Sequence, residues 1–183
     1  MKELSLNILD IAENSVRAGA TLIEISLTEQ DKVLTIVIRD NGCGMSRETL
    51  ERVENPFYTT RTTRSVGLGI PLYKLAAEQT GGSVTISSIQ ECEDAEQHGT
   101  TVTAVFHTAH IDCAPLGDMV STVCTLIHGS PRIDFVYTHT APGLAVKLDT
   151  REMRAVLGEE IPLDSFEVMQ WIQESLKEQY HQI

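Results

Sequence analysis

The chain has few basic residues and no long apolar run. Of its 183 residues, 14 are Lys or Arg and 26 are Asp or Glu, which gives a formal net charge of −12. Nucleic-acid binding requires clustered Lys and Arg, and no such cluster occurs. No stretch approaches the roughly 18 consecutive apolar residues of a membrane-spanning helix, and no basic segment followed by an apolar one opens the sequence. We therefore expect a cytoplasmic protein that binds neither nucleic acid nor membranes.

Two further absences exclude common kinds of site. The four cysteines show no C-x-x-C spacing, which favours reduced thiols over a zinc site or a disulfide framework. No G-x-x-x-x-G-K-[ST] segment and no complete G-x-G-x-x-G segment occurs, so a P-loop nucleotide site is not expected. The remaining composition is that of an ordinary soluble protein, with 42% hydrophobic residues, and it suits one domain with or without a small appendage.

Hydrophobic periodicity predicts an α+β fold for residues 1–107. Apolar residues recur at helical spacing from Leu4 to Ala18, and Gly19 ends the pattern. Two runs rich in Ile, Val and Leu follow, joined by a turn over 29–31, and they predict a β-hairpin. The expected elements are helices over 4–18 and 70–79, a short helical segment over 47–53 within a loop, and strands over 21–27, 33–39, 83–89 and 100–107.

Residues 108–183 are expected to form a small C-terminal α/β extension of unknown role. The expected elements are a helix over 119–128 capped by Asp118, strands over 132–138 and 144–148, and two final helices. We interpret His139 as a cap or surface residue. We interpret Trp171 on the last helix as a core residue, and the alternative is a partner groove that Trp171 forms with Phe166 and Met169.

Three polar residues share one face of the first expected helix. Asp10 and Asn14 are four residues apart, so their side chains stand one turn apart, and Arg17 follows three residues later. A carboxylate, an amide oxygen and a guanidinium suit a water molecule, a Mg²⁺ ion and a phosphate, respectively. The alternative is a solvated polar face whose residues only pair with one another.

A glycine-rich segment, Asp40-Asn-Gly42-Cys-Gly44, follows the second expected strand. A carboxylate fixed at a strand end can accept a hydrogen bond from the amino group of adenine. It would discriminate against guanine, which presents a carbonyl at the same place. Glycines beside the carboxylate let the backbone approach a ligand without a Cβ. The alternative is a simple glycine-rich turn.

Two later stretches complete a predicted ATP site. Pro56-Phe-Tyr-Thr-Thr-Arg61 lies in the long loop. Gly67-Leu68-Gly69 precedes an expected helix, whose N-terminal N–H groups and partial positive charge suit a triphosphate. A lone G-x-G segment is weak evidence, and its alternative is a tight turn. The order and spacing of all four stretches nevertheless predict a site for ATP and Mg²⁺.

In this order the four stretches resemble the GHKL superfamily, the ATP-binding fold shared by gyrase, certain chaperones, histidine kinases and MutL-type repair proteins. The resemblance covers about residues 1–107 and implies a Bergerat-type fold, which is a two-layer α/β sandwich. Residues 10–45 resemble the N box and G1 box of MutL-type and kinase-type members. Residues 56–61 and 67–70 resemble the F box and G2 box of histidine kinases.

The resemblance also implies roles for single residues. The implied contacts are Asn14 to Mg²⁺, Arg17 to phosphate, Asp40 to adenine, Arg61 to the γ-phosphate, and Thr101 as support for the adenine site. Residues 45–66 would form a lid. The complete implied ATP-binding set is Asn14, Arg17, Asp40, Gly42, Gly44, Arg61, Gly67, Leu68, Gly69 and Thr101.

Two features depart from the family pattern. Asp10 stands where hydrolysing members typically carry Glu, which positions the attacking water or hydroxyl, and its carboxylate is set back by roughly 1.5 Å. A displacement of this size can lower a rate about 100-fold, so we expect Asp10 to be a poor catalytic base and hydrolysis to be slow. The sequence also has no His-Glu-x-x-x-Pro phosphoacceptor signature, so we expect a free-standing module rather than a complete sensor kinase.

These features lead to two functional hypotheses. The first is a kinase-like ATPase module in signalling that phosphorylates or regulates a protein partner in trans, through positioning and charge neutralisation. The alternative is an ATP-gated switch that hydrolyses ATP slowly and transfers no phosphate. A scaffold that binds no nucleotide is disfavoured because Asn14 and Asp40 are intact. The motifs name no partner, and residues 108–183 are left open to form a homodimer, to dock or to extend the sheet.

Overall fold

The fold is built on a mixed six-stranded β-sheet with the strand order β3-β4-β2-β1-β5-β6. The computed structural model describes residues 3–54, 69–158 and 160–181. The strands are β1 (Leu22–Gln30), β2 (Val33–Asp40), β3 (Ser83–Ile89), β4 (Gly99–His107), β5 (Asp134–Ala141) and β6 (Leu144–Asp149). Neighbouring strands are antiparallel except β1 and β5, which are parallel.

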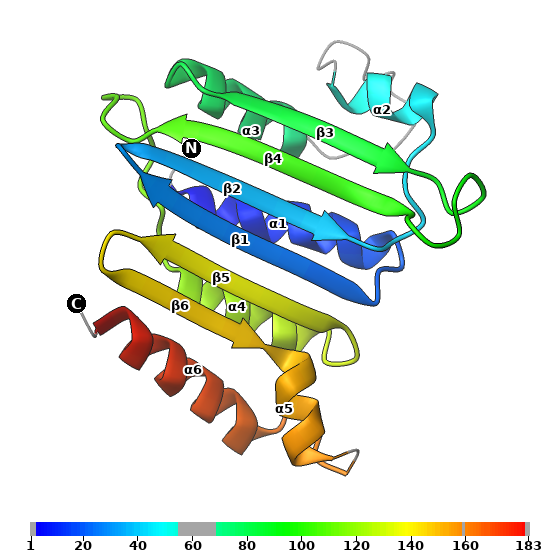
Figure 1. The fold of residues 1–183 in the computed structure, drawn as a ribbon, viewed down its shortest axis with the longest axis vertical. Coiled ribbons are helices and arrows are strands. Elements are labelled where there is room, and N and C mark those ends of the chain that lie inside the picture. Colours follow the sequence, from blue (N-terminus) through cyan, green and yellow to red (C-terminus); the bar gives the residue numbers. More distant parts are fainter. Residues whose placement is uncertain (1–2, 55–68, 159, 182–183) are drawn as a thin grey trace.

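Helices cover one face of this sheet and one of its ends. They are α1 (Leu4–Arg17), α2 (Arg47–Glu54), α3 (Gly69–Gln79), α4 (Met119–Gly129), α5 (Thr150–Leu157) and α6 (Phe166–His181). Figure 1 shows α3, α1 and α4 side by side behind the sheet, with α5 and α6 beyond β6. This two-layer arrangement confirms the predicted α+β sandwich. None of the helices within the described ranges is long and apolar enough to cross a membrane.

The β1–β2 hairpin follows from alternation of side chains. On β1, Ile23, Ile25 and Leu27 are at most 2% exposed, and they face the helices while their neighbours face the open side of the sheet. The hairpin turn consists of Asp31 and Lys32, which both have positive φ, 52° and 64°, as a two-residue type I′ turn requires. The turn therefore lies at 31–32 rather than 29–31, and both strands continue to it.

Residues 108–183 extend the same sheet. β5 pairs in parallel with β1 from Leu22↔Asp134 onward, and β6 completes the edge. The segment before α4 also contacts the start of α1, where the N–H of Leu4 donates to Pro115 O over 2.9 Å and the N–H of Ser5 donates to Leu116 O over 2.8 Å. These carbonyls satisfy N–H groups that a helix start leaves without intrahelical partners. The C-terminal part thus supports the helix that carries Asp10 and Asn14.

His139 is buried within β5, so its interpretation as a cap or surface residue was wrong. It is 2% exposed because the inward positions of β5 alternate through Tyr137 and His139. Its Nδ1 lies 2.8 Å from Tyr180 Oη and its Nε2 lies 2.8 Å from Glu29 Oε1. Burial raises the pKa of both Tyr137 and Tyr180, so both phenols stay protonated at neutral pH. The hydrogen bonds of His139 thus connect the C-terminal end of α6 to β1 and β5.

Asp118 caps α4, as its position in the sequence predicted. Its Oδ1 accepts the N–H of Ser121 over 2.9 Å, and its Oδ2 accepts the Ser121 hydroxyl over 2.7 Å. These bonds hold the pKa of the carboxyl below its ordinary value. We expect Asp118→Ala to lower the free energy of unfolding by about 1 kcal/mol, measured by urea denaturation at neutral pH, because α4 loses the acceptor for its first turn.

The matched variant Asp118→Asn keeps a capping oxygen, so we expect it to be nearly as stable as the wild type at neutral pH. Because the folded-state pKa is lowered, the stabilisation by the carboxylate is present above the unfolded-state pKa of about 3.9. It is lost as the pH falls through the folded-state pKa. Any difference in the free energy of unfolding between the wild type and Asp118→Asn should therefore become smaller in acid. If Asp118→Ala were as stable as the wild type at neutral pH, the capping role of Asp118 would be ruled out.

Candidate functional site

Asp40 ends β2 and is only 7% exposed. Its side chain points toward the helix layer because alternate residues of β2 are buried there. Ser15 Oγ of α1 donates to Asp40 Oδ2 over 2.6 Å. The N–H of Gly42 donates to Oδ1 over 2.9 Å, and the N–H of Thr100 donates to Oδ1 over 3.2 Å. Three segments far apart in sequence thus converge on this carboxylate.

These hydrogen bonds fix the carboxylate and leave part of its accepting capacity unused. A carboxylate offers about four lone-pair positions, two on each oxygen. Among the described residues, Oδ1 of Asp40 accepts two N–H groups and Oδ2 accepts one hydroxyl. Oδ2 therefore keeps a lone pair that no described residue uses. A buried carboxylate held in this way suits an N–H donor of a ligand, such as the amino group of adenine.

The glycines after Asp40 are required by backbone packing. A Cβ on Gly42 would lie 2.9 Å from both the Cβ and the carbonyl oxygen of Ala18. Gly44 has a φ of +70°, and a Cβ there would lie 1.9 Å from the carbonyl oxygen of Ile89. Only glycine fits either position. The glycine-rich turn thus packs between the end of α1 and the end of β3. This packing alone explains why both positions are glycine, with no need for a ligand.

Three more hydrogen bonds hold this turn. The N–H of Cys43 donates to Ala18 O over 2.9 Å, and the N–H of Glu91 donates to Cys43 O over 3.0 Å. His98 Nδ1 lies 2.6 Å from Gly42 O. Since a carbonyl only accepts, Nδ1 of His98 carries the proton. His98 was not predicted as a site residue, because nothing in its local sequence indicates that it reaches a turn more than fifty residues earlier.

On α1, only some residues of the predicted polar face form hydrogen bonds with one another. Arg17 Nη1 donates to Asn14 Oδ1 over 3.2 Å, and Arg17 Nη2 donates to Glu13 Oε2 over 3.3 Å. The Arg17 and Glu13 side chains are 70% and 46% exposed, so their ion pair is weak and can exchange for another anion. Asp10 is exposed, and its carboxylate accepts no hydrogen bond from the residues that the structure describes.

Gly69, the first residue of α3, lies beside Asp10. A Cβ on Gly69 would lie 3.7 Å from both Cβ and Oδ2 of Asp10. The N-terminus of α3 therefore borders the face of α1 that carries Asp10. The structure thus brings the α1 face, the Asp40 turn and Gly69 into one neighbourhood, because Ser15 joins α1 to Asp40 and Asp10 lies next to Gly69.

Other predicted residues fall outside the described ranges. Arg61, Gly67 and Leu68 belong to this group, as does the whole stretch over 56–61 and the portion of the predicted lid over 55–66. The described start of that segment contains α2 (Arg47–Glu54). This helix confirms the short helical segment expected over 47–53.

The structure brings Thr100, and not Thr101, to Asp40. Thr101 pairs with Arg39 on β2, and both side chains face the open side of the sheet, away from Asp40. Thr100 shares the inward face with buried Val102. The alternation of buried residues along β4 was the sequence signal that could have placed Thr100 on the inward face.

Ser15 is the third site residue whose role the sequence did not reveal, after His98 and Thr100. It is 4% exposed and lies on the buried face of α1. A buried hydroxyl needs a hydrogen-bond partner, and this requirement signals a role for Ser15. The partner itself, Asp40, lies on another element and could be identified only in the folded structure.

Comparison with known proteins identifies the family of the chain. Residues 2–110 match the family of histidine kinase-, DNA gyrase B-, and HSP90-like ATPases. The chain is 37% identical to sporulation kinase E of Bacillus subtilis (strain 168) over 83 residues, which are 44% of this chain and 11% of that kinase. It is 28% identical to sporulation kinase B of the same strain over 103 residues, which are 56% of this chain and 22% of that kinase. The chain thus spans less than a quarter of the length of these relatives.

Among solved structures, the MutL ATPase domain of Aquifex aeolicus complexed with ADP is similar, with a TM-score of 0.55 at 12% identity. The similarity covers 95% of this chain and 88% of that one. At this identity the likeness shows the fold alone, and its extent means that it includes much of the sheet extension. Because the family match spans more than half of the sequence, the chain belongs to the histidine kinase-, DNA gyrase B-, and HSP90-like ATPases, as its resemblance to the GHKL superfamily implied.

Proposed function

We propose that the chain is an ATP-binding, histidine kinase-like module that acts in signalling on a protein partner in trans. The observation that carries the proposal is the Asp40 carboxylate, which is buried, held by three hydrogen bonds and still able to accept another donor. The family supports ATP as the ligand, and the sporulation kinases among the relatives support a role in signalling.

The described residues have distinct roles in this proposal. Asp40 accepts the amino group of adenine, and Ser15 and Thr100 orient Asp40 from two sides. Asn14 supplies an amide oxygen to Mg²⁺, and this fits because, among the described residues, Oδ1 accepts a hydrogen bond only from the exposed guanidinium of Arg17. Arg17 exchanges its pairing with Glu13 for a phosphate oxygen. Mg²⁺ held there would supply positive charge that offsets the charge of the phosphates.

Asp10 orients the attacking water or acceptor hydroxyl, but from a side chain one methylene shorter than Glu. The N-terminal N–H groups of α3, next to Asp10, offer donors and a partial positive charge to the phosphates. We also propose that the partner is a protein rather than nucleic acid, since a net charge of −12 repels a phosphate backbone, and that the module works in the cytoplasm.

An ATP-gated switch is the second candidate. The observation that favours it is Asp10, because a base set back by roughly 1.5 Å lowers the rate of phosphate transfer and hydrolysis and prolongs the ATP-bound state. In this version, ATP binding changes which surfaces are available to a partner, and no phosphate is transferred.

Calorimetry with purified protein tests ATP binding directly. We expect saturable heat with ATP and Mg²⁺, and binding of GTP at least about tenfold weaker, because the carbonyl of guanine would face the carboxylate of Asp40. Incubation with ATP labelled at the γ-phosphate then separates the two candidates, since label on a protein partner supports a kinase and tight binding without transfer supports a switch. Folded protein that gives no saturable heat would overturn both.

A further inference from the structure

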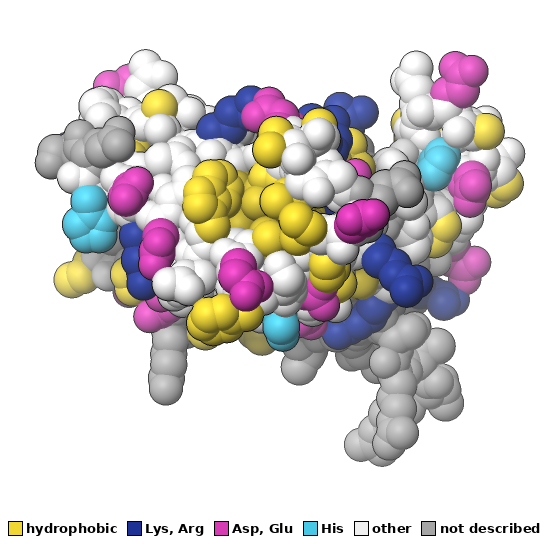
Figure 2. Space-filling view, turned by 90° about the horizontal axis from the view of Figure 1, so that it is seen from below, with side chains coloured by type: hydrophobic (Ala, Val, Ile, Leu, Met, Phe, Trp, Pro, Cys, Tyr) yellow, Lys and Arg dark blue, Asp and Glu magenta, His cyan; other side chains and the backbone are white. Residues whose placement is uncertain are grey.

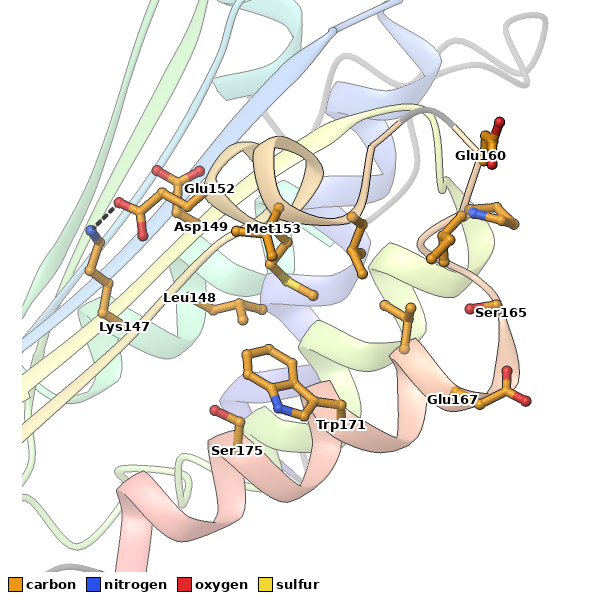
Figure 3. A pocket seen from close by; sticks show the side chains of 15 residues that line it. Lys147, Leu148, Asp149, Glu152, Met153, Glu160, Ser165, Glu167, Trp171 and Ser175 are labelled. Carbon is orange, nitrogen blue, oxygen red and sulfur yellow. Dashed lines mark hydrogen bonds and ion pairs between the residues drawn. The ribbon is translucent and has the colours of Figure 1, made fainter.

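A groove of about 930 Å³ lies at the end of the molecule formed by α5, α6 and β6. We call it the α5–α6 groove. Figure 3 shows Met153 and Trp171 facing each other across it, with Leu148 of β6 between them. It is separate from the Asp40 site, which lies where α1 meets β2 and β4. Figure 1 places α5 and α6 beyond β6, at the end of the sheet opposite α3 and β3.

The walls of this groove expose large apolar side chains. Val156 of α5 is 87% exposed, Trp171 of α6 is 55% exposed, and Ile161 of the connection between them is 46% exposed. Trp171 is thus not a core residue, contrary to the first interpretation. Figure 2 looks onto this end of the molecule and shows hydrophobic side chains gathered at its centre, with acidic side chains around them. A contiguous apolar patch with a polar rim is typical of a protein-binding surface.

The rim of the groove is acidic, and its charges are unevenly compensated. Glu152 pairs with Lys147 over 2.8 Å at one end. Figure 3 shows Glu160 and Glu167 at the other end, and neither forms an ion pair with any residue in the described ranges. The whole chain carries a net charge of −12. The groove therefore presents an apolar floor and an uncompensated negative end.

We propose that the α5–α6 groove docks a basic amphipathic helix of a partner protein. The apolar face of such a helix, with residues at i, i+3 or i+4 and i+7, would cover Val156 and Trp171. Its Lys or Arg residues would lie against Glu160 and Glu167. This site is independent of the ATP site and gives a partner a place to bind while the nucleotide site stays open.

Three other occupants fit the structure less well. A strand added to the edge of β6 is disfavoured because the N–H of Lys147 already donates to Gln179 Oε1 of α6 over 2.8 Å. A second copy of the chain would bring one acidic rim against another. A small apolar molecule would remain largely uncovered, since Val156 and Trp171 stand open to solvent, whereas small-ligand sites bury most of the ligand.

Trp171 is the single tryptophan of the chain, so its fluorescence reports on the groove. The probe is a synthetic amphipathic helix of about 14 residues, roughly 21 Å long, with Leu on one face and Lys beside it. We expect a saturable blue shift of Trp171 emission, weakened by raising the salt from about 50 to about 500 mM. A peptide with Glu in place of Lys should bind at least about tenfold more weakly.

Variants connect this signal to the groove. Val156→Glu should weaken binding of the Lys peptide at least about tenfold, because it places a charge in the apolar contact. The double variant Glu160→Gln and Glu167→Gln should weaken it about fivefold at low salt. The matched control is Ile111→Glu, since Ile111 is 94% exposed in the segment after β4 and does not line the groove, and it should bind as the wild type does. Circular dichroism verifies the fold of each variant.

Other outcomes would overturn the proposal. Equal shifts with the Lys and Glu peptides would mean non-specific apolar adsorption. If anilinonaphthalene sulfonate shifts the Trp171 emission and the Lys peptide does not displace it, the groove would be a small-molecule site. A shift that grows with protein concentration alone, with a doubled mass in sedimentation, would indicate pairing of two copies. Unchanged binding by Val156→Glu would place the peptide elsewhere.

Discussion

Replacing Asp40 by Asn is expected to weaken ATP binding about 100-fold while the protein stays folded. Oδ1 of Asp40 accepts two backbone N–H groups, so the oxygen of an Asn side chain would take that position. The amide NH₂ would then replace Oδ2, where the hydroxyl of Ser15 can turn to accept it. The amino group of adenine cannot turn, and would meet a donor instead of an acceptor. An unmatched buried donor costs about 1–3 kcal/mol, which corresponds to about a 5- to 150-fold loss of affinity, and the rigid adenine amino group places the expected loss in the upper part of this range.

The same substitution should narrow the preference for ATP over GTP, because an NH₂ group can donate to the carbonyl of guanine. Calorimetry with both nucleotides measures this change. The matched control is Asp31→Asn, which removes the same charge at an exposed turn residue with a φ of 52°, where Asn is well tolerated. If Asp40→Asn bound ATP as tightly as the wild type, the carboxylate would not read adenine, and the proposed orientation of the nucleotide would be wrong.

Replacing Asp10 by Glu is expected to raise the rate of ATP hydrolysis by up to about 100-fold. The longer side chain moves the carboxylate forward by roughly 1.5 Å, into the place that the family resemblance implies for a catalytic Glu. The structure has room for it, because Asp10 is exposed and even a Cβ on the neighbouring Gly69 would lie at ordinary contact distance, 3.7 Å, from Oδ2 of Asp10. Phosphate release under saturating ATP measures the rate.

Two control measurements accompany the expected rate increase of Asp10→Glu. The affinity for ATP, measured by calorimetry, should change little in Asp10→Glu, since the substitution alters the position of the base and not the adenine contacts. Asp10→Asn should hydrolyse ATP no faster than the wild type, because an amide cannot accept the proton. An Asp10→Glu variant that binds ATP normally but turns it over no faster would remove Asp10 from the catalytic role.

The sequence by itself determined the parts of the protein that depend on local pattern. Helical spacing predicted α1 and placed Asp10 and Asn14 one turn apart on it, because a 3.6-residue period fixes which side chains share a face. Strand alternation and turn chemistry predicted the β1–β2 hairpin and the position of Asp40 at a strand end. The order of the four motifs indicated the family, which the match over residues 2–110 confirmed.

Only the tertiary structure decided how these pieces combine. It placed Ser15 and Thr100 on Asp40, joined β5 to β1, buried His139 and exposed Trp171. Each of these outcomes depends on which element packs against which, and on the register of the sheet, where a shift of one residue would turn Thr101 inward and Thr100 outward. A local pattern indicates that a side chain is buried. It does not indicate the partner of that side chain, because the partner comes from a distant part of the chain and is brought into contact only when the whole sheet has formed.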